Sequence, residues 1–192
     1  MPGPDYPWAT YITGAKWADR PSPTRIDAVL LHAVSLRSAE DLIALRERGD
    51  TAYHYAVTET GAVVQMAPER GWCRAVGKTT RPCYSDKRVI HIAIDGAPDQ
   101  AEWPDDQVLA VARIVGVIWA VRGRLPVRDA GNVARPQGRI PEITAWPWLH
   151  MHQLIPRLET PIDIIYRNMT PQSDGEYPEP EGAFAPYLDC GV

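Results

Sequence analysis

Cysteine is scarce in this sequence of 192 residues, which holds only three, at positions 73, 83 and 190. Three cysteines are too few, and of the wrong parity, for a disulfide framework, and no CxxC pair indicates a zinc knuckle. A bridge between Cys73 and Cys83 stays open as an alternative. Stability must come mainly from an apolar core, for which a hydrophobic content of 45% is sufficient.

Long apolar runs are absent, and so is an excess of positive charge. No window of about eighteen apolar residues exists, and the first residues have neither a basic region nor an apolar stretch, so we expect no membrane span and no cleavable signal. The net charge is −4 and the pI is near 5.7. Proteins that bind nucleic acids usually carry a basic excess. We therefore expect neither a membrane nor a nucleic acid as partner.

Proline is abundant instead, with 19 residues that concentrate at the two ends of the chain. This distribution predicts an N-terminal arm over 1–24, one domain over 25–168 and an acidic, proline-rich C-terminal arm over 169–192. The C-terminal arm ends with apolar side chains, among them Phe184 and Tyr187. A loose tail and a segment that docks on a partner both remain open.

Between the arms, apolar runs alternate with helical patterns. The expected elements are strands at 25–33 and 89–94, a β-hairpin of 53–58 and 62–66, helices at 38–49 and 106–122, and mostly loop at 124–148. The second helix is apolar around much of its circumference, which is typical of a buried helix. The pattern predicts an α/β (α+β) domain with a central mixed β-sheet flanked by helices.

Histidine supplies the first candidates for chemistry. His32 falls at the end of the first predicted strand, where a side chain can project into a cleft, although a lone histidine on a strand is more often structural. His150 and His152 share one face if 149–154 is extended, and Glu159 follows them. These residue types at this spacing are compatible with a zinc site of three ligands.

The order of several motifs along the chain resembles that of one known protein family. The segments are the strand ending in His32, the hairpin from Ala52 to Met66, Trp72-Cys-Arg-Ala-Val-Gly, Ile90-His-Ile-Ala-Ile-Asp-Gly and Trp103-Pro-Asp-Asp-Gln before a long helix. Together they resemble the zinc-dependent N-acetylmuramoyl-L-alanine amidases, which include phage lysins and peptidoglycan recognition proteins. The resemblance covers about 25–165.

The resemblance implies a zinc ion that polarises a lactyl-amide carbonyl and activates a water molecule. It implies that His32 is the first zinc histidine and that Tyr53 orients the carbonyl or the water. Other positions depart from the family pattern. Arg74 replaces a histidine, Ala93 replaces a glutamate, and His91 replaces a small glycine, either as a packing residue or as bulk that fills the former cleft.

The second half of the family's zinc motif can be aligned with the chain in two registers. Each register places an unsuitable residue at one or more positions of the motif. Alignment on Pro156 puts Met151 at the histidine position, Arg157 at the lysine and Glu159 at the third ligand. Glutamate is an acceptable zinc ligand.

The other register, aligned on Pro161, restores His150 but puts Leu158 at the lysine and Thr160, a poor ligand, at the third position. A shift of one residue would also allow His150 or His152 to join Glu159 beside His32.

Two functions follow from the resemblance. One is an amidase-fold protein with an eroded zinc site and no cofactor, which serves as a peptidoglycan-binding or structural module, for example of a phage particle. Its arms would contact other structural proteins, and its location would be a virion or the cytoplasm. The other is an active zinc amidase that hydrolyses the muramoyl-L-alanine bond. For the enzyme, the candidate ligands are His32, His150, His152 and Glu159, the catalytic residues are Tyr53 and Arg157, and the substrate-binding residues are Trp72, Arg74 and Trp148.

Overall fold

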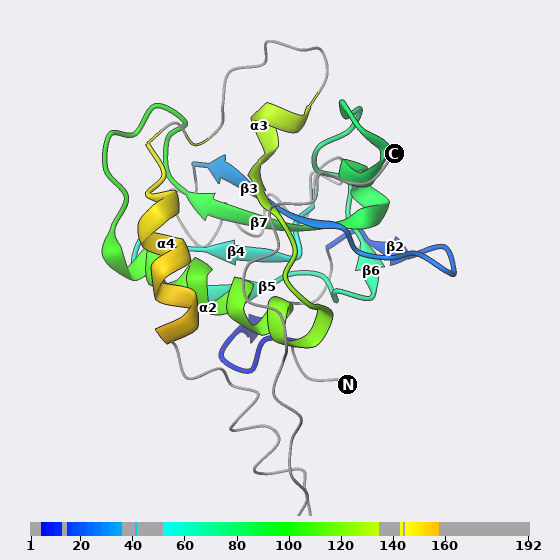
Figure 1. Cartoon of the computed structure of the whole chain (residues 1–192), viewed down its shortest axis with the longest axis horizontal. Helices are drawn as coiled ribbons and strands as arrows, with labels where there is room; N and C mark the ends of the chain where they lie inside the picture. The colour runs from blue at the N-terminus through cyan, green and yellow to red at the C-terminus, as the bar shows by residue number, and fades with distance from the viewer. Residues whose placement is uncertain are drawn as a thin grey trace, which may run out of the picture.

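A six-stranded sheet forms the centre of the protein in a computed structural model, which describes residues 5–12, 15–35, 41, 52–134, 143 and 145–157 (Figure 1). The strands, in their order across the sheet, are β1 (Thr10–Tyr11), β5 (Val63–Gln65), β4 (Tyr55–Val57), β7 (Val89–Asp95), β3 (Ala28–Val34) and β8 (Val127–Asp129).

The sheet is mixed, as the sequence predicts. β4, β7, β3 and β8 run parallel to one another, β5 is antiparallel to β4, and β1 is parallel to β5. The two longest strands, β3 and β7, form the centre because their continuous apolar runs suit a strand that is covered on both faces. Their pairing places His32 opposite Ala93.

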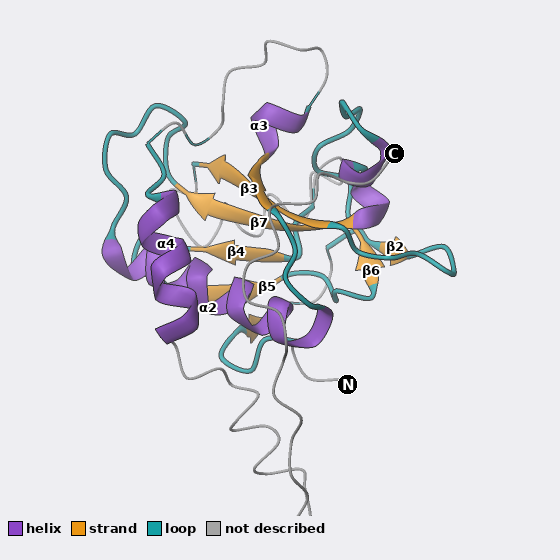
Figure 2. Ribbon diagram, in the orientation of Figure 1, coloured by secondary structure: helices purple, strands orange, loops and turns teal. Residues whose placement is uncertain are grey.

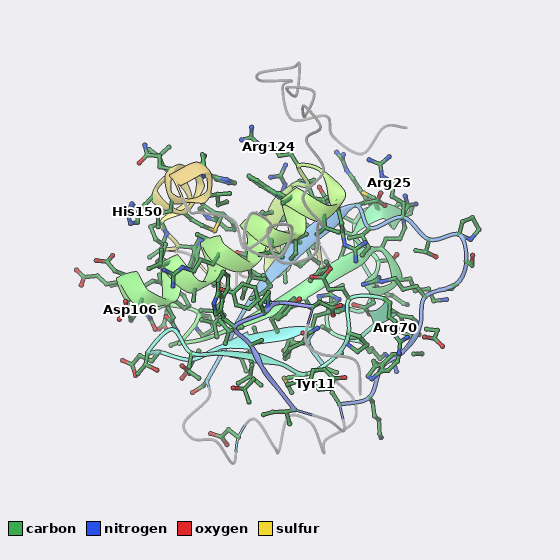
Figure 3. All side chains as sticks on the ribbon, turned by 90° about the horizontal axis from the view of Figure 1, so that it is seen from below. Tyr11, Arg25, Arg70, Asp106, Arg124 and His150 are labelled. Atoms are coloured by element: carbon green, nitrogen blue, oxygen red, sulfur yellow. The ribbon has the colours of Figure 1, made fainter. Side chains whose placement is uncertain are left out.

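Helices cover one face of this sheet. α2 (Asp105–Arg122) is buried along most of its length and packs on side chains from β3, β4 and β7, so the predicted buried helix is confirmed. α4 (Trp148–Leu154) packs on α2 and continues into a 3-10 turn, η3 (Ile155–Arg157). Figure 2 and Figure 3 show both helices on the same side of the sheet.

Short elements cover the opposite face. They are β2 (Ala18–Asp19), which pairs antiparallel with β6 (Gly71–Trp72), and the 3-10 turns η1 (Pro82–Tyr84) and η2 (Asp86–Arg88). Two apolar clusters pack here, built around Ala56 and Ala93 in one case and Leu30 in the other. In Figure 1, β2 and β6 lie beside the ends at which β3 and β7 begin.

The described part of the N-terminal segment packs on the domain. β1 adds an edge strand to the sheet, and Tyr6, which is 2% exposed, contacts Tyr55 edge to face at 6.5 Å between ring centroids. The predicted domain limits stay predictions. The expected C-terminal arm over 169–192 and, apart from residue 41, the expected helix over 38–49 lie outside the described residues.

The structure settles several local points that the sequence left open. Within the stretch 124–148, which was expected to be mostly loop, the described residues include β8 and a short helix, α3 (Ala130–Val133). Residues 149–154 are helical, so side chains two positions apart point to different sides. Cys73 is a buried free thiol, so no bridge joins it to Cys83.

A search for bilayer-spanning helices, limited to the described residues, finds no helix with the length and apolarity required.

The β4–β5 hairpin is fixed to the start of α2 through Gly61. This glycine has a φ of 76°, and a Cβ atom added there would lie 2.6 Å from the backbone oxygen of Asp106. Both the positive φ and the close approach of the helix therefore require glycine.

We expect Gly61→Ala to lower the free energy of unfolding by about 2–4 kcal/mol, because backbone strain and a clash with the helix backbone add together. Gly77→Ala is the matched control, since Gly77 has a φ of 71° but no atom within 4 Å of an added Cβ. The control should cost only about 1 kcal/mol. Urea unfolding followed by circular dichroism measures both, and equal losses would contradict the proposed contact with α2.

Candidate functional site

Three buried histidines lie on the face of the sheet that α2 does not cover. They are His32 near the end of β3, His91 in β7 and His54 just before β4, and each is at most 2% exposed. Side chains alternate along a strand, so His32 shares its face with Leu30 rather than with Leu31, which packs on α2.

His32 and His91 contact each other directly. The Nε2 atom of His32 lies 3.0 Å from Nδ1 of His91. On its other side, His91 Nε2 lies 3.1 Å from Oδ1 of Asp86, although the N–H does not point straight at that oxygen. The three side chains form a continuous chain, which we call the Asp86–His91–His32 relay.

Asp86 is held in a cradle of backbone N–H groups. Its Oδ1 accepts hydrogen bonds from Val76 N at 2.9 Å and Ala75 N at 3.2 Å, and its Oδ2 accepts one from Gly77 N at 3.3 Å. Burial acts to raise the pKa of Asp86, but the contact with His91 and these backbone donors outweigh it, so the pKa is lowered. Asp86 is therefore a carboxylate at neutral pH.

The contacts of the relay are compatible with one arrangement of protons on the two rings. Burial lowers the pKa of His91 to about 4, so the ring is neutral near pH 7. A neutral His91 that faces the Asp86 carboxylate with Nε2–H presents a lone pair at Nδ1, so His32 must donate its own Nε2–H to it. In this arrangement Nε2 of His32 has no lone pair for a metal ion.

His54 stacks on His91 and is held from both sides. Its Nδ1 accepts a hydrogen bond from the backbone N of His91 at 3.0 Å, so the proton of the neutral ring is on Nε2, which lies 3.2 Å from the Gly71 oxygen. Arg20 NH2 lies 3.1 Å from the same Nε2. Burial lowers the pKa of His54 well below 6.5, and His91 and Arg20 lower it further.

Glu69 is a second buried polar group, and it forms hydrogen bonds with β4 and α2. Glu69 accepts a hydrogen bond from Tyr55 Oη at 2.8 Å and two from Arg122, at 2.9 and 3.1 Å. Arg20 also donates from Nε to the Glu69 backbone oxygen at 3.0 Å. Because the partners of Glu69 are all protein groups that join separate elements, we assign it a structural role.

Of the predicted catalytic residues, Tyr53 lies beside His32. The two rings pack edge to face with 5.0 Å between their centroids, and Tyr53 is buried. Arg157 is the last residue of η3, next to α4. Glu159 lies outside the described residues.

The histidines of α4 lie on the other side of the sheet from His32. His152 stacks on Trp119 of α2, with 5.8 Å between ring centroids, and His150 is exposed. Because α4 packs on α2, the sheet itself separates both histidines from His32. The structure thus brings together His32 and Tyr53, but not His32 with His150 or His152.

The predicted substrate-binding residues are also divided between two places. Trp148 begins α4 and packs against the α2 core. Trp72 lies in β6 with the Lys87 ammonium 5.6 Å from its ring centroid, and Arg74 is exposed just beyond. They do not form one groove.

The described residues beside His32 do not fit a zinc ion. The residues in register with it across the sheet are Ala93 of β7 and Ala56 of β4, and Ala130, which follows β8, is buried in an apolar cluster. Within the described ranges no three His, Cys, Asp or Glu side chains come together as a metal-binding group. A zinc site needs three protein ligands with free lone pairs.

Sequence reasoning missed the roles of Asp86 and Arg20. A histidine inside the apolar run of β7 was a visible signal, because a buried imidazole needs partners for both nitrogens. Nothing in the sequence indicated that Asp86 would supply one of them, because its cradle forms only when 75–77 folds back on η2.

Protonation of His54 would break its bond with the backbone N of His91, so the folded protein resists it. In the unfolded chain His54 binds a proton near pH 6.5. A lowered pKa in the folded state means that stability is lost as the pH falls below about 6.5. We expect His54→Asn, which keeps an acceptor but does not titrate, to reduce this loss by up to about 1.4 kcal/mol per pH unit.

Urea unfolding between about pH 7 and pH 5 measures the effect. His150→Asn is the comparison variant, because the same substitution then removes an exposed histidine instead of a buried one. An unchanged slope in His54→Asn would contradict the neutral, buried state of His54.

The chain matches the sequence model of one known protein family. The family model described as N-acetylmuramoyl-L-alanine amidase matches residues 22–153. A search of curated protein sequences finds no match.

Solved structures share the fold. A selenomethionine derivative of AmpD superposes with a TM-score of 0.67 at 14% identity, covering 80% of this chain and 98% of that one. AmiD from E. coli gives 0.55 at 14% identity, covering 69% and 59%. The Ph2119 endolysin of a Thermus scotoductus bacteriophage gives 0.51 at 17% identity, covering 71% and 88%. These similarities confirm the α/β amidase fold, and the family model covers most of the sequence. The chain therefore belongs to the N-acetylmuramoyl-L-alanine amidase family.

Proposed function

We propose that this chain binds peptidoglycan through its amidase fold and does not hydrolyse the muramoyl-L-alanine bond by zinc chemistry. The observation that supports this most directly is the Asp86–His91–His32 relay, in which Nε2 of His32 lies 3.0 Å from Nδ1 of His91 and is engaged by that ring. The alanines at the neighbouring positions, Ala93 and Ala130, offer no ligand in its place.

The family supports the choice of ligand. The AmiD structure is a complex with anhydro-N-acetylmuramic acid-L-Ala-D-γ-Glu-L-Lys, which is a muramic acid that carries a stem peptide. A ligand of this kind offers hydroxyl, amide and carboxylate groups, and protein side chains can bind all of these by hydrogen bonds without a metal.

The carboxyl ends of the parallel strands are the natural place for it, because ligands of open α/β sheets bind beyond those ends. Two exposed polar side chains lie there. Ser35 directly follows β3, and Asn132 lies in α3, directly after β8. β3 and β8 are neighbours in the sheet, so both residues belong to one edge.

Active zinc hydrolysis is the rival function. The contact between His32 and Tyr53 favours it, because the family resemblance pairs a zinc histidine with this tyrosine. Metal content and reaction products distinguish the two functions.

For protein purified without chelator, we expect far less than one zinc per chain by plasma mass spectrometry, and the same value for His32→Ala and for the exposed control His150→Ala. The protein should sediment with purified peptidoglycan sacculi and release no new L-alanine amine, measured by reaction with fluorodinitrobenzene. A known zinc amidase serves as the positive control.

One tightly held zinc that is lost in His32→Ala but kept in His150→Ala, together with release of the amine, would establish the rival. Failure to sediment with sacculi would refute peptidoglycan binding.

The double variant Ser35→Ala/Asn132→Ala tests whether peptidoglycan binds at the carboxyl ends of β3 and β8. Loss of two hydrogen bonds of about 1 kcal/mol each should weaken binding to sacculi by roughly tenfold or more. Arg113→Ala, an exposed change on α2, should bind like the parent protein. Equal binding by the double variant would place the ligand elsewhere.

A further inference from the structure

Positive charge is concentrated on one face of this acidic protein. Segments 15–27 and 70–88 hold nine lysines and arginines against three aspartates, although the chain as a whole has a net charge of −4. We call these two segments the basic face. In Figure 3, Arg25 and Arg70 lie on one side of the molecule, and Asp106 and His150 lie on the other.

The two segments form one continuous surface. β2 pairs with β6, and β6 contacts η2. Arg20 joins them further, since its side chain donates to the backbone oxygens of Lys87 at 2.5 Å and Val89 at 2.8 Å. Two tryptophans lie within the same surface, Trp17 beneath the Arg70 guanidinium and Trp72 beneath the Lys87 ammonium, each 5.6 Å from ring centroid to charge.

Of the three aspartates of the basic face, only Asp19 is exposed. Asp86 is buried in its cradle, and Asp27 is paired with Arg88 and lies 3.6 Å from Arg25. Exposed cations, including Arg70, Arg74, Lys78 and Lys87, therefore present net positive charge to whatever covers them.

A cysteine in the basic face supplies a second, independent observation. Cys83 lies in η1, buried beside Tyr84, and it is disulfide-bonded. Cys73 is a free thiol. The chain has three cysteines, so Cys190 is the remaining candidate partner within it.

The sequence around Cys190 has the complementary charge. Residues 170–192 hold five aspartates and glutamates and no lysine or arginine. Arg157 ends the described part of the chain, and the 33 residues from there to Cys190 can span on the order of 100 Å when extended, so reach is not limiting.

We propose that the acidic C-terminal segment 170–192 docks on the basic face and is tied there by a disulfide between Cys83 and Cys190. The bond forms from two thiols, whose two protons and two electrons pass to an oxidant such as a small-molecule disulfide. This proposal is independent of the proposed function, since it involves neither zinc nor sacculi.

The covalent part is tested by peptide mapping of the full chain. The protein is unfolded in N-ethylmaleimide without reductant, digested and analysed by mass spectrometry. We expect one linked pair of peptides containing Cys83 and Cys190, with Cys73 alkylated. Alkylated Cys83, a Cys83–Cys73 pair, or a link between two copies of the chain would overturn it.

The electrostatic part is tested by hydrogen exchange of peptides from 170–192. We expect slowed exchange in the parent protein at low salt, and faster exchange at high salt, in Cys190→Ser with salt, and in Arg74→Glu/Lys87→Glu. Arg113→Glu on α2 is the control of equal charge change per residue and should leave the exchange unchanged. Exchange at the rate of a free peptide in the parent protein, or equal exchange in the parent and the double variant, would refute docking on the basic face.

Discussion

The parallel pairing of β3 with β7 determines the character of the site, because it places two histidine rings against each other on a buried face. His32 Nε2 and His91 Nδ1 lie 3.0 Å apart, and Asp86 holds the far side of His91. Buried ring nitrogens need hydrogen-bond partners, and at this burial each ring supplies one to the other.

The arrangement of the helices also keeps other histidines away from His32. α4 packs on α2, so its histidines lie behind the helix layer, while His32 faces the opposite side of the sheet. No rotamer change moves a side chain through a close-packed sheet. The positions of these histidines do not determine the fold, since the core that stabilises it is built from other side chains.

Sequence patterns predicted the elements that carry long or distinctive signals. β3 and β7 followed from apolar runs, the hairpin from Gly61, and α2 from its buried circumference. β1 and β2 are two residues long, and β8 is three, so none shows enough alternation to be recognised. The site was harder. His32 and Tyr53 were identified from the family resemblance, but the partner of His32 is set by strand register and by the cradle of Asp86, which are tertiary features.

We propose that His32 donates its Nε2 proton to His91, which leaves this nitrogen without a lone pair for zinc. Long-range ¹H–¹⁵N spectra of the histidine rings near neutral pH measure this directly, with and without added zinc. We expect a neutral His91 ring, a proton on Nε2 of each residue, and nitrogen shifts that zinc leaves unchanged. A shift of the His32 Nε2 resonance to a metal-bound value on addition of zinc, reversed by chelator, would contradict it.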